Sequence, residues 1–120
     1  MRPVPRGERG AGYWRAPISW EHDRWELEAL TRDSIGYAHH HLGHAVRAIA
    51  SYQRAVELFR ELGDRYNQGM SLNRLGDSHQ AAGNTAAAGR AWRQALTILS
   101  ELDHPDAAQV RGKLDTRTIV

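Results

Sequence analysis

The stretch IGYAHHHLGHAVRAIASYQRAVELFRELGD, residues 35–64, decides the fold because the chain carries a second version of it. Shifted by 40 residues, it falls without a gap on LGDSHQAAGNTAAAGRAWRQALTILSELDH, residues 75–104. Seven positions are identical in the two stretches: Gly36/Gly76, His39/His79, Gly43/Gly83, Ala48/Ala88, Ala55/Ala95, Glu61/Glu101 and Leu62/Leu102. Self-similarity at a fixed period is the signature of a repeat architecture, so the sequence predicts two tandem units.

Each unit is expected to contain two helices. Residues 45–62 show apolar residues every three or four positions, which is the period of an amphipathic helix. Gly43 and Gly83 stand where a tight turn between helices needs positive φ. Gly63-Asp64 and Asp103-His104-Pro105 end the second helix of each unit. Asn84 is expected to cap the helix that follows it, because its side chain can accept from free backbone amides.

These signals predict an all-α fold of antiparallel helix-turn-helix repeats that stack into an α-solenoid. Residues 1–22 are expected to be irregular, with Trp14 and Trp20 folded back onto the first helix pair. Two 40-residue repeats follow, at about 23–63 and 64–104, and residues 105–120 form a capping helix and tail. In that last helix, from Pro105 to about Thr116, Ala108, Val110 and Leu114 are expected to face inwards and Arg111, Lys113 and Asp115 to face water.

Small residues indicate close contact between helices. Gly36 and Ala48 in the first unit recur as Gly76 and Ala88. The large rings of Tyr52 and Trp92 are expected to fill the space that these residues leave. A large side chain at Gly36 would then overpack the helix pair, which typically costs about 1–3 kcal/mol.

Composition excludes several classes of function. The 120 residues contain no cysteine, so disulfides, thiolate metal sites and cysteine nucleophiles are excluded. A net charge of +2 is too even to argue for nucleic acid or an anionic membrane as a partner. No apolar run approaches the length of a membrane span. A cytoplasmic protein without a cofactor is the expectation.

Four histidines form the main candidate for chemistry. His40 and His44 are four residues apart and could share a metal on one continuous helix, but Gly43 is expected to break the helix between them. A structural or exposed role therefore competes with a histidine-based metal or pH sensor using His39, His40, His41 and His44. The carboxylates Glu26, Glu28 and Asp33 have no nucleophile, oxyanion donors or cofactor loop beside them, so an enzyme is not expected.

The repeat resembles the tetratricopeptide repeat (TPR) family. The family's pattern stands here as Ile35-Gly36, His39, Gly43, Ala48, Tyr52 and Ala55-Val56, and again as Leu75-Gly76, His79, Gly83, Ala88, Trp92 and Ala95-Leu96. Two features depart from it: the period is 40 instead of the usual 34, and Arg32 and Leu72 replace the tryptophan that often opens the motif. The resemblance covers about residues 24–104.

This resemblance implies a scaffold that binds a protein or peptide in the groove lined by the first helix of each unit. Carried over, the groove positions are Asp33, Tyr37, His40, Asn73, Arg74, Asp77 and Gln80. They do not reproduce the lysine-and-asparagine carboxylate clamp of chaperone-binding relatives, so a carboxy-terminal peptide carboxylate is not the expected ligand. The competing interpretation is that these side chains are solvent-exposed and have no binding role.

A narrower likeness rests on the wording DSIGYAHHHLG at 33–43, FRELGDR at 59–65 and HPDA at 104–107. It is similar to the carboxy-terminal repeat region of bacterial transcriptional regulators that carry an NB-ARC module. The phosphate-binding loop and a helix-turn-helix reader are missing from this sequence. The likeness therefore implies the sensor or scaffold end of such a regulator, without direct contact to nucleic acid or membrane.

Two repeats are few, since stacks of this kind usually need about three before their terminal apolar faces are covered. The exposed face of the first helix pair, near Trp14, Trp20 and Trp25, is therefore expected to meet a second copy or a missing neighbour. A homodimer is the resulting prediction.

Overall fold

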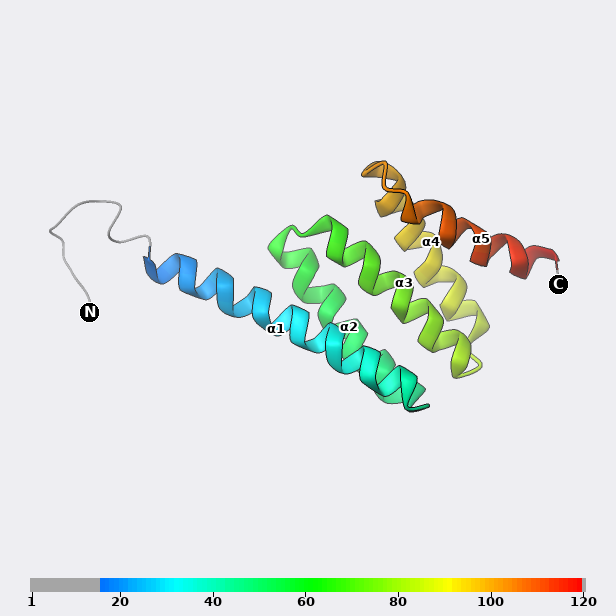
Figure 1. Cartoon of the computed structure of the whole chain (residues 1–120), viewed down its shortest axis with the longest axis horizontal. Helices are drawn as coiled ribbons and strands as arrows, with labels where there is room; N and C mark the ends of the chain where they lie inside the picture. Colours follow the sequence, from blue (N-terminus) through cyan, green and yellow to red (C-terminus); the bar gives the residue numbers. More distant parts are fainter. Residues whose placement is uncertain (1–15, 120) are drawn as a thin grey trace, which may run out of the picture.

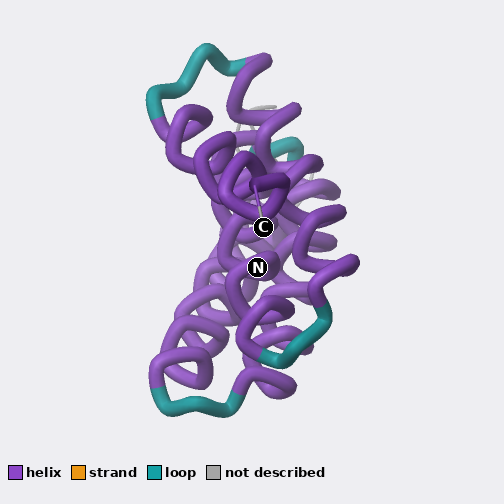
Figure 2. The backbone as a smooth tube through the Cα atoms, turned by 90° about the vertical axis from the view of Figure 1, so that its right-hand side faces the viewer, coloured by secondary structure: helices purple, strands orange, loops and turns teal. Residues whose placement is uncertain are grey.

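The computed structural model describes the backbone of residues 16–119 and the side chains of residues 20–116. In this part of the chain the elements are α1 (Ala16–His41), α2 (Ala45–Leu62), α3 (Arg65–Ala81), α4 (Thr85–Glu101) and α5 (Asp106–Ile119). Each helix packs on the next one along the chain, from α1 on α2 to α4 on α5 (Figure 1). The expected fold class is confirmed: the helices form consecutive antiparallel pairs, as in a TPR-like solenoid. Short loops at the ends of the helices make the connections (Figure 2).

The glycine turns follow the sequence prediction. Gly43 and Gly83 have φ of 82° and 85°, and Gly63 after α2 has 74°. These are left-handed values that glycine adopts without steric cost. After α4 the equivalent position is Asp103, which takes φ of 54°. Both units therefore end their second helix in a left-handed turn. Glycine occupies the turn position in the first unit, and Asp103 occupies it in the second.

The two helix starts after the turns differ. Asn84 is the N-cap residue of α4, but its side chain does not bond to an amide of the first turn. Its Nδ2 lies 3.4 Å from Nδ1 of His79 instead. The capping role expected for Asn84 is thus wrong. Asp64 does cap α3, because its Oδ1 accepts from the backbone N–H of Asn67 at 3.0 Å.

The core lies between the paired helices and is arranged as the small residues indicated. Tyr52 and Trp92 are buried. A Cβ atom added to Gly36 would lie 2.8 Å from the Tyr52 ring, and one added to Gly76 would lie closer still to the Trp92 ring. Both glycines are therefore required by packing, since real side chains do not approach so closely.

The start of α1 differs from the sequence prediction. Irregular chain was expected up to residue 22, but α1 begins at Ala16. Pro17 does not prevent this, because the first turn of a helix leaves its N–H groups unpaired in any case. Trp20 is 71% exposed, so it does not fold back onto the first helix pair. Trp14 lies outside the described residues.

The last helix has a slightly different register from the one expected. Ala107 and Val110 are buried against α4, with Leu114 partly buried beside them, whereas Ala108 is exposed. Lys113 was expected to face water, but it reaches α3. None of the helices in the described region is both long and apolar enough to cross a bilayer.

Candidate functional site

The helices α1, α3 and α5 share one face of the stack, in front of α2 and α4 in the view of Figure 1. Polar contacts between their side chains join them. One set links Asp33 of α1 to α3, and a second links Lys113 of α5 to α3. We call this surface the polar face. Five of the groove positions carried over from sequence take part in these contacts: Asp33, His40, Asn73, Arg74 and Asp77.

Asp33 connects the first two of these helices. Its carboxylate accepts a hydrogen bond from Ser71 Oγ at 2.7 Å and from Arg74 Nη1 at 2.9 Å. The Asp33 side chain is mostly buried, whereas that of Arg74 keeps 37% of its surface exposed. The pair therefore holds a guanidinium group at the surface in a fixed position, which lowers the entropy that a ligand must remove.

Lys113 makes the equivalent link from α5. Its Nζ donates to Asn73 Oδ1 at 2.8 Å and to the two oxygens of Asp77 at 2.8 and 3.1 Å. Trp92 Nε1 donates to the same Asp77 carboxylate and to the backbone oxygen of Asn73, each at 3.2 Å. Asn73 is buried, so it holds the core and α5 together and is not available to a ligand.

A signal for Lys113 was present in the sequence. The 40-residue shift that leads from Asp33 to Asn73 leads next to Lys113. The last helix therefore stands where the first helix of a third unit would stand. The apolar residues of α5 alone do not indicate that Lys113 faces inwards.

The remaining groove positions fall into two groups. His40 is half-buried and shares a hydrogen bond of 3.0 Å with Ser78 Oγ, across α1 and α3. Tyr37 is 55% exposed, with its ring centroid 4.1 Å from that of His41. Gln80 is exposed at the end of α3. Tyr37 and Gln80 are thus exposed, and Arg74 and Asp77 keep 37% and 36% of their side-chain surface exposed, so a partner can reach all four.

The four histidines do not form a compact ligand set. Among the residues that the structure describes, no three His, Cys, Asp or Glu side chains come together as a metal site requires. His40 bonds to Ser78, and His41 lies against Tyr37. Nδ1 of His39 is buried with no partner found in the described part of the chain. His79 of the second unit has a pKa lowered by burial and by the charge of Arg90.

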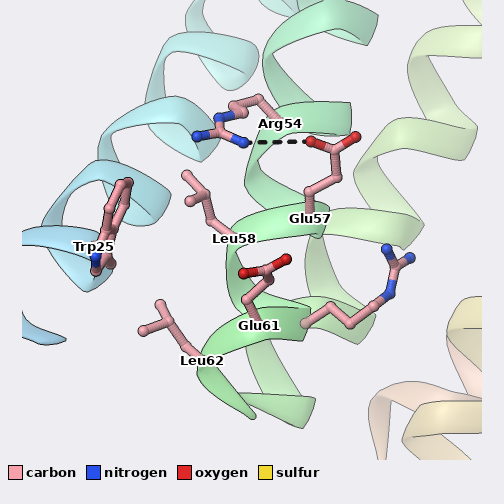
Figure 3. Close-up of a pocket in the computed structure, with 7 residues that line it drawn as sticks. Trp25, Arg54, Glu57, Leu58, Glu61 and Leu62 are labelled. Carbon is pink, nitrogen blue, oxygen red and sulfur yellow. Dashed lines mark hydrogen bonds and ion pairs between the residues drawn. The ribbon is translucent and has the colours of Figure 1, made fainter.

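A second surface feature was not anticipated from sequence. Trp25 of α1 and the carboxyl-terminal half of α2 enclose an open hollow of about 490 Å³ (Figure 3). Its apolar wall is Trp25, Leu58 and Leu62, and its charged rim is Arg54, Glu57, Arg60 and Glu61. Arg54 pairs with Glu57 at 3.4 Å, so this rim is largely self-neutralised.

The sequence was compared with known protein families. The profile described as tetratricopeptide repeat matches residues 25–101, which is more than half of the chain. The chain belongs to the tetratricopeptide repeat family. No curated protein and no solved structure matches it.

The match runs from the middle of α1 to the end of α4, so α5 lies beyond it. TPR units generally mediate contacts between proteins, and the family is one of non-catalytic scaffolds.

Proposed function

We propose that this TPR chain is a protein-interaction module that binds a peptide segment of a partner along the polar face. The observation that supports it most is the fixed placement of Arg74 by Asp33 and of Lys113 by Asp77. Side chains already held by their neighbours lose little entropy when a ligand arrives. Tyr37 of α1 and Gln80 of α3 are exposed, and they offer an aromatic ring and an amide for contact with a ligand.

The charges of the polar face indicate the chemistry of the ligand. The Arg74 guanidinium and the Lys113 ammonium are each paired with a carboxylate, so little net charge is left for a strongly acidic peptide. A ligand that exchanges hydrogen bonds and packs an apolar group on Tyr37 fits better. An extended or helical segment of a protein has both features.

A finer proposal concerns the protein's setting. The likeness of residues 33–43, 59–65 and 104–107 to the repeat regions of bacterial NB-ARC regulators supports a role as the sensor or scaffold part of a signalling or transcriptional regulator. In such a role the polar face would receive a protein signal, and the chain would work in the cytoplasm.

The test is selection of peptides from a displayed random library, followed by affinity measurements on the full chain. Tyr37→Ala and Gln80→Ala should each weaken a selected peptide by about fivefold or more, since side chains at the centre of a small interface carry most of its energy. Gln94→Ala, an exposed glutamine on α4, is the matched control and should leave affinity unchanged. Selected peptides that bind the Tyr37 and Gln80 variants as tightly as the unaltered chain would refute the polar face as the binding site.

A further inference from the structure

The outer surface of α1 is apolar and lacks a cover among the residues that the structure describes. A shallow hollow of about 430 Å³ runs along it, lined by Leu27, Leu30, Thr31, Ser34, Ile35 and Ala38. All of these residues belong to α1, so no other described segment packs over them. Leu27 is 66% exposed, and Trp20 and Leu42 continue the same helical stripe at its two ends. Contiguous apolar surface of this kind on a soluble protein usually marks an interaction site.

The repeat shows what kind of element fits there. Shifted by 40 residues, Thr31, Ile35 and Ala38 fall on Ser71, Leu75 and Ser78 of α3, and all three of these are buried. In α3 that face packs on α2, a helix that runs antiparallel to it, and Ser71 and Ser78 also bond to Asp33 and His40 of α1. The open face of α1 therefore corresponds to a face that receives an antiparallel helix in α3, and no described segment covers it.

The pattern of residues along α1 identifies the helix. Four of the exposed apolar side chains are placed symmetrically about Thr31: Leu27 and Ile35 lie four residues on either side, and Trp20 and Leu42, the latter one residue past the end of α1, lie eleven on either side. Leu30 does not follow this pattern, because Arg32 stands at its symmetric position. A helix with this spacing matches itself when it is turned about a two-fold axis through Thr31. Small side chains at Thr31, Ser34 and Ala38 allow the two backbones to approach.

Polar side chains at the edge of α1 agree with the same arrangement. Glu21 and Asp23 are exposed in its amino-terminal half, next to the exposed Arg24, and His41 is exposed in its last turn. A two-fold axis at Thr31 brings Asp23 of one copy to the edge where His41 of the second copy lies. Opposite helix dipoles also align favourably in this antiparallel pair.

We propose that two copies of this chain associate through their α1 helices, antiparallel about a two-fold axis near Thr31, each copy providing the cover that a preceding repeat would provide. The interface is isologous, because the same residues of both copies form it. It lies opposite the side of α1 that packs on α2, and it leaves Arg74 and Gln80 of the polar face free. This proposal does not depend on the peptide-binding role proposed above.

The first test is the mass of the full chain by sedimentation or light scattering over a series of concentrations. The unaltered chain should change from monomer to dimer, and Leu27→Glu should raise the dissociation constant by about tenfold or more, as for loss of a central interface contact. Leu102→Glu makes the same change at an exposed leucine at the other end of the stack, and it should leave the dimer intact. Circular dichroism should show equal helix content in all three proteins.

The second test uses the absence of cysteine from the chain. Thr31→Cys places one thiol next to the proposed axis, where two copies can form a disulfide under mild oxidation. The covalent dimer should form rapidly at concentrations where the chain is dimeric. Gln53→Cys on the exposed surface of α2 should not give it. A chain that remains monomeric at every concentration, or a dimer that neither Leu27→Glu weakens nor Thr31→Cys traps, would overturn the proposal.

Discussion

The helices α1 and α3 occupy equivalent places in the two repeats, yet their outer faces differ. Ile35 of α1 is 39% exposed, whereas its counterpart Leu75 in α3 is only 7% exposed. Ser71 and Ser78 of α3 are buried, and they bond to Asp33 and His40 of α1. The face that is closed in α3 by the preceding unit is open in α1.

The difference shows that a repeat unit is incomplete by itself. Stability in such a stack comes from each unit together with its contact to the next. At the carboxyl end, α5 covers α4 with Ala107 and Val110. At the amino end, no described segment covers α1 in the same way. Its outer apolar face is exposed instead. In the described structure the outer side of α4 is therefore covered by α5, whereas the outer face of α1 is open.

The sharpest way to test this contrast is to truncate the two equivalent side chains. Leu75→Ala should cost about 2–4 kcal/mol of unfolding free energy, because it leaves a cavity between helices. Ile35→Ala should cost about 1 kcal/mol or less in the dilute chain, since much of its surface is already in water. Urea unfolding at low protein concentration measures both. Equal losses would mean that the outer face of α1 is covered in the monomer.

A second comparison concerns the glycines under the two rings. Gly76→Ala should destabilise by about 1–3 kcal/mol through overpacking, and by more than Gly36→Ala, because the Trp92 ring lies closer than the Tyr52 ring. Gly112→Ala in α5 is the control, since a Cβ atom there meets nothing within 4 Å. That change should stabilise slightly, because alanine is the better helix former. Thermal unfolding of the three variants would decide it; a Gly76→Ala chain as stable as the parent would contradict the packing described.

The smallest expected effect concerns the histidine of the second unit. The pKa of His79 is lowered from its ordinary value of 6.5, so the folded chain disfavours the charged ring. Below about pH 6.5 the unfolded chain binds a proton that the folded chain resists, and stability must fall as the solution is acidified. His79→Gln should reduce this loss between pH 7 and pH 5. Denaturant midpoints of both proteins at several pH values measure it, and identical pH slopes would refute it.

Much of the fold was predictable because the two repeats of this chain can be aligned with each other. Gly43 and Gly83 predicted the turns, and the pairing of Gly36 with Tyr52 followed from size alone. The polar face was harder to assign. Family positions gave Asp33 and Asn73, but their bonds to Arg74 and Lys113 depend on tertiary contacts between helices that a linear pattern does not contain. The prediction that Asn84 caps α4 was wrong because its side chain lies near His79 of α3, a contact between helices, and not at the first turn of α4.

Amide hydrogen exchange at several protein concentrations tests most directly the claim that α1 is open until a second copy closes it. Local opening of a helix is slowed when its surface becomes buried. We expect protection of residues 27–42 to rise with concentration, while that of α3 stays constant and is already high at the lowest concentration. Protection of α1 that equals that of α3 and does not change with concentration would contradict the account.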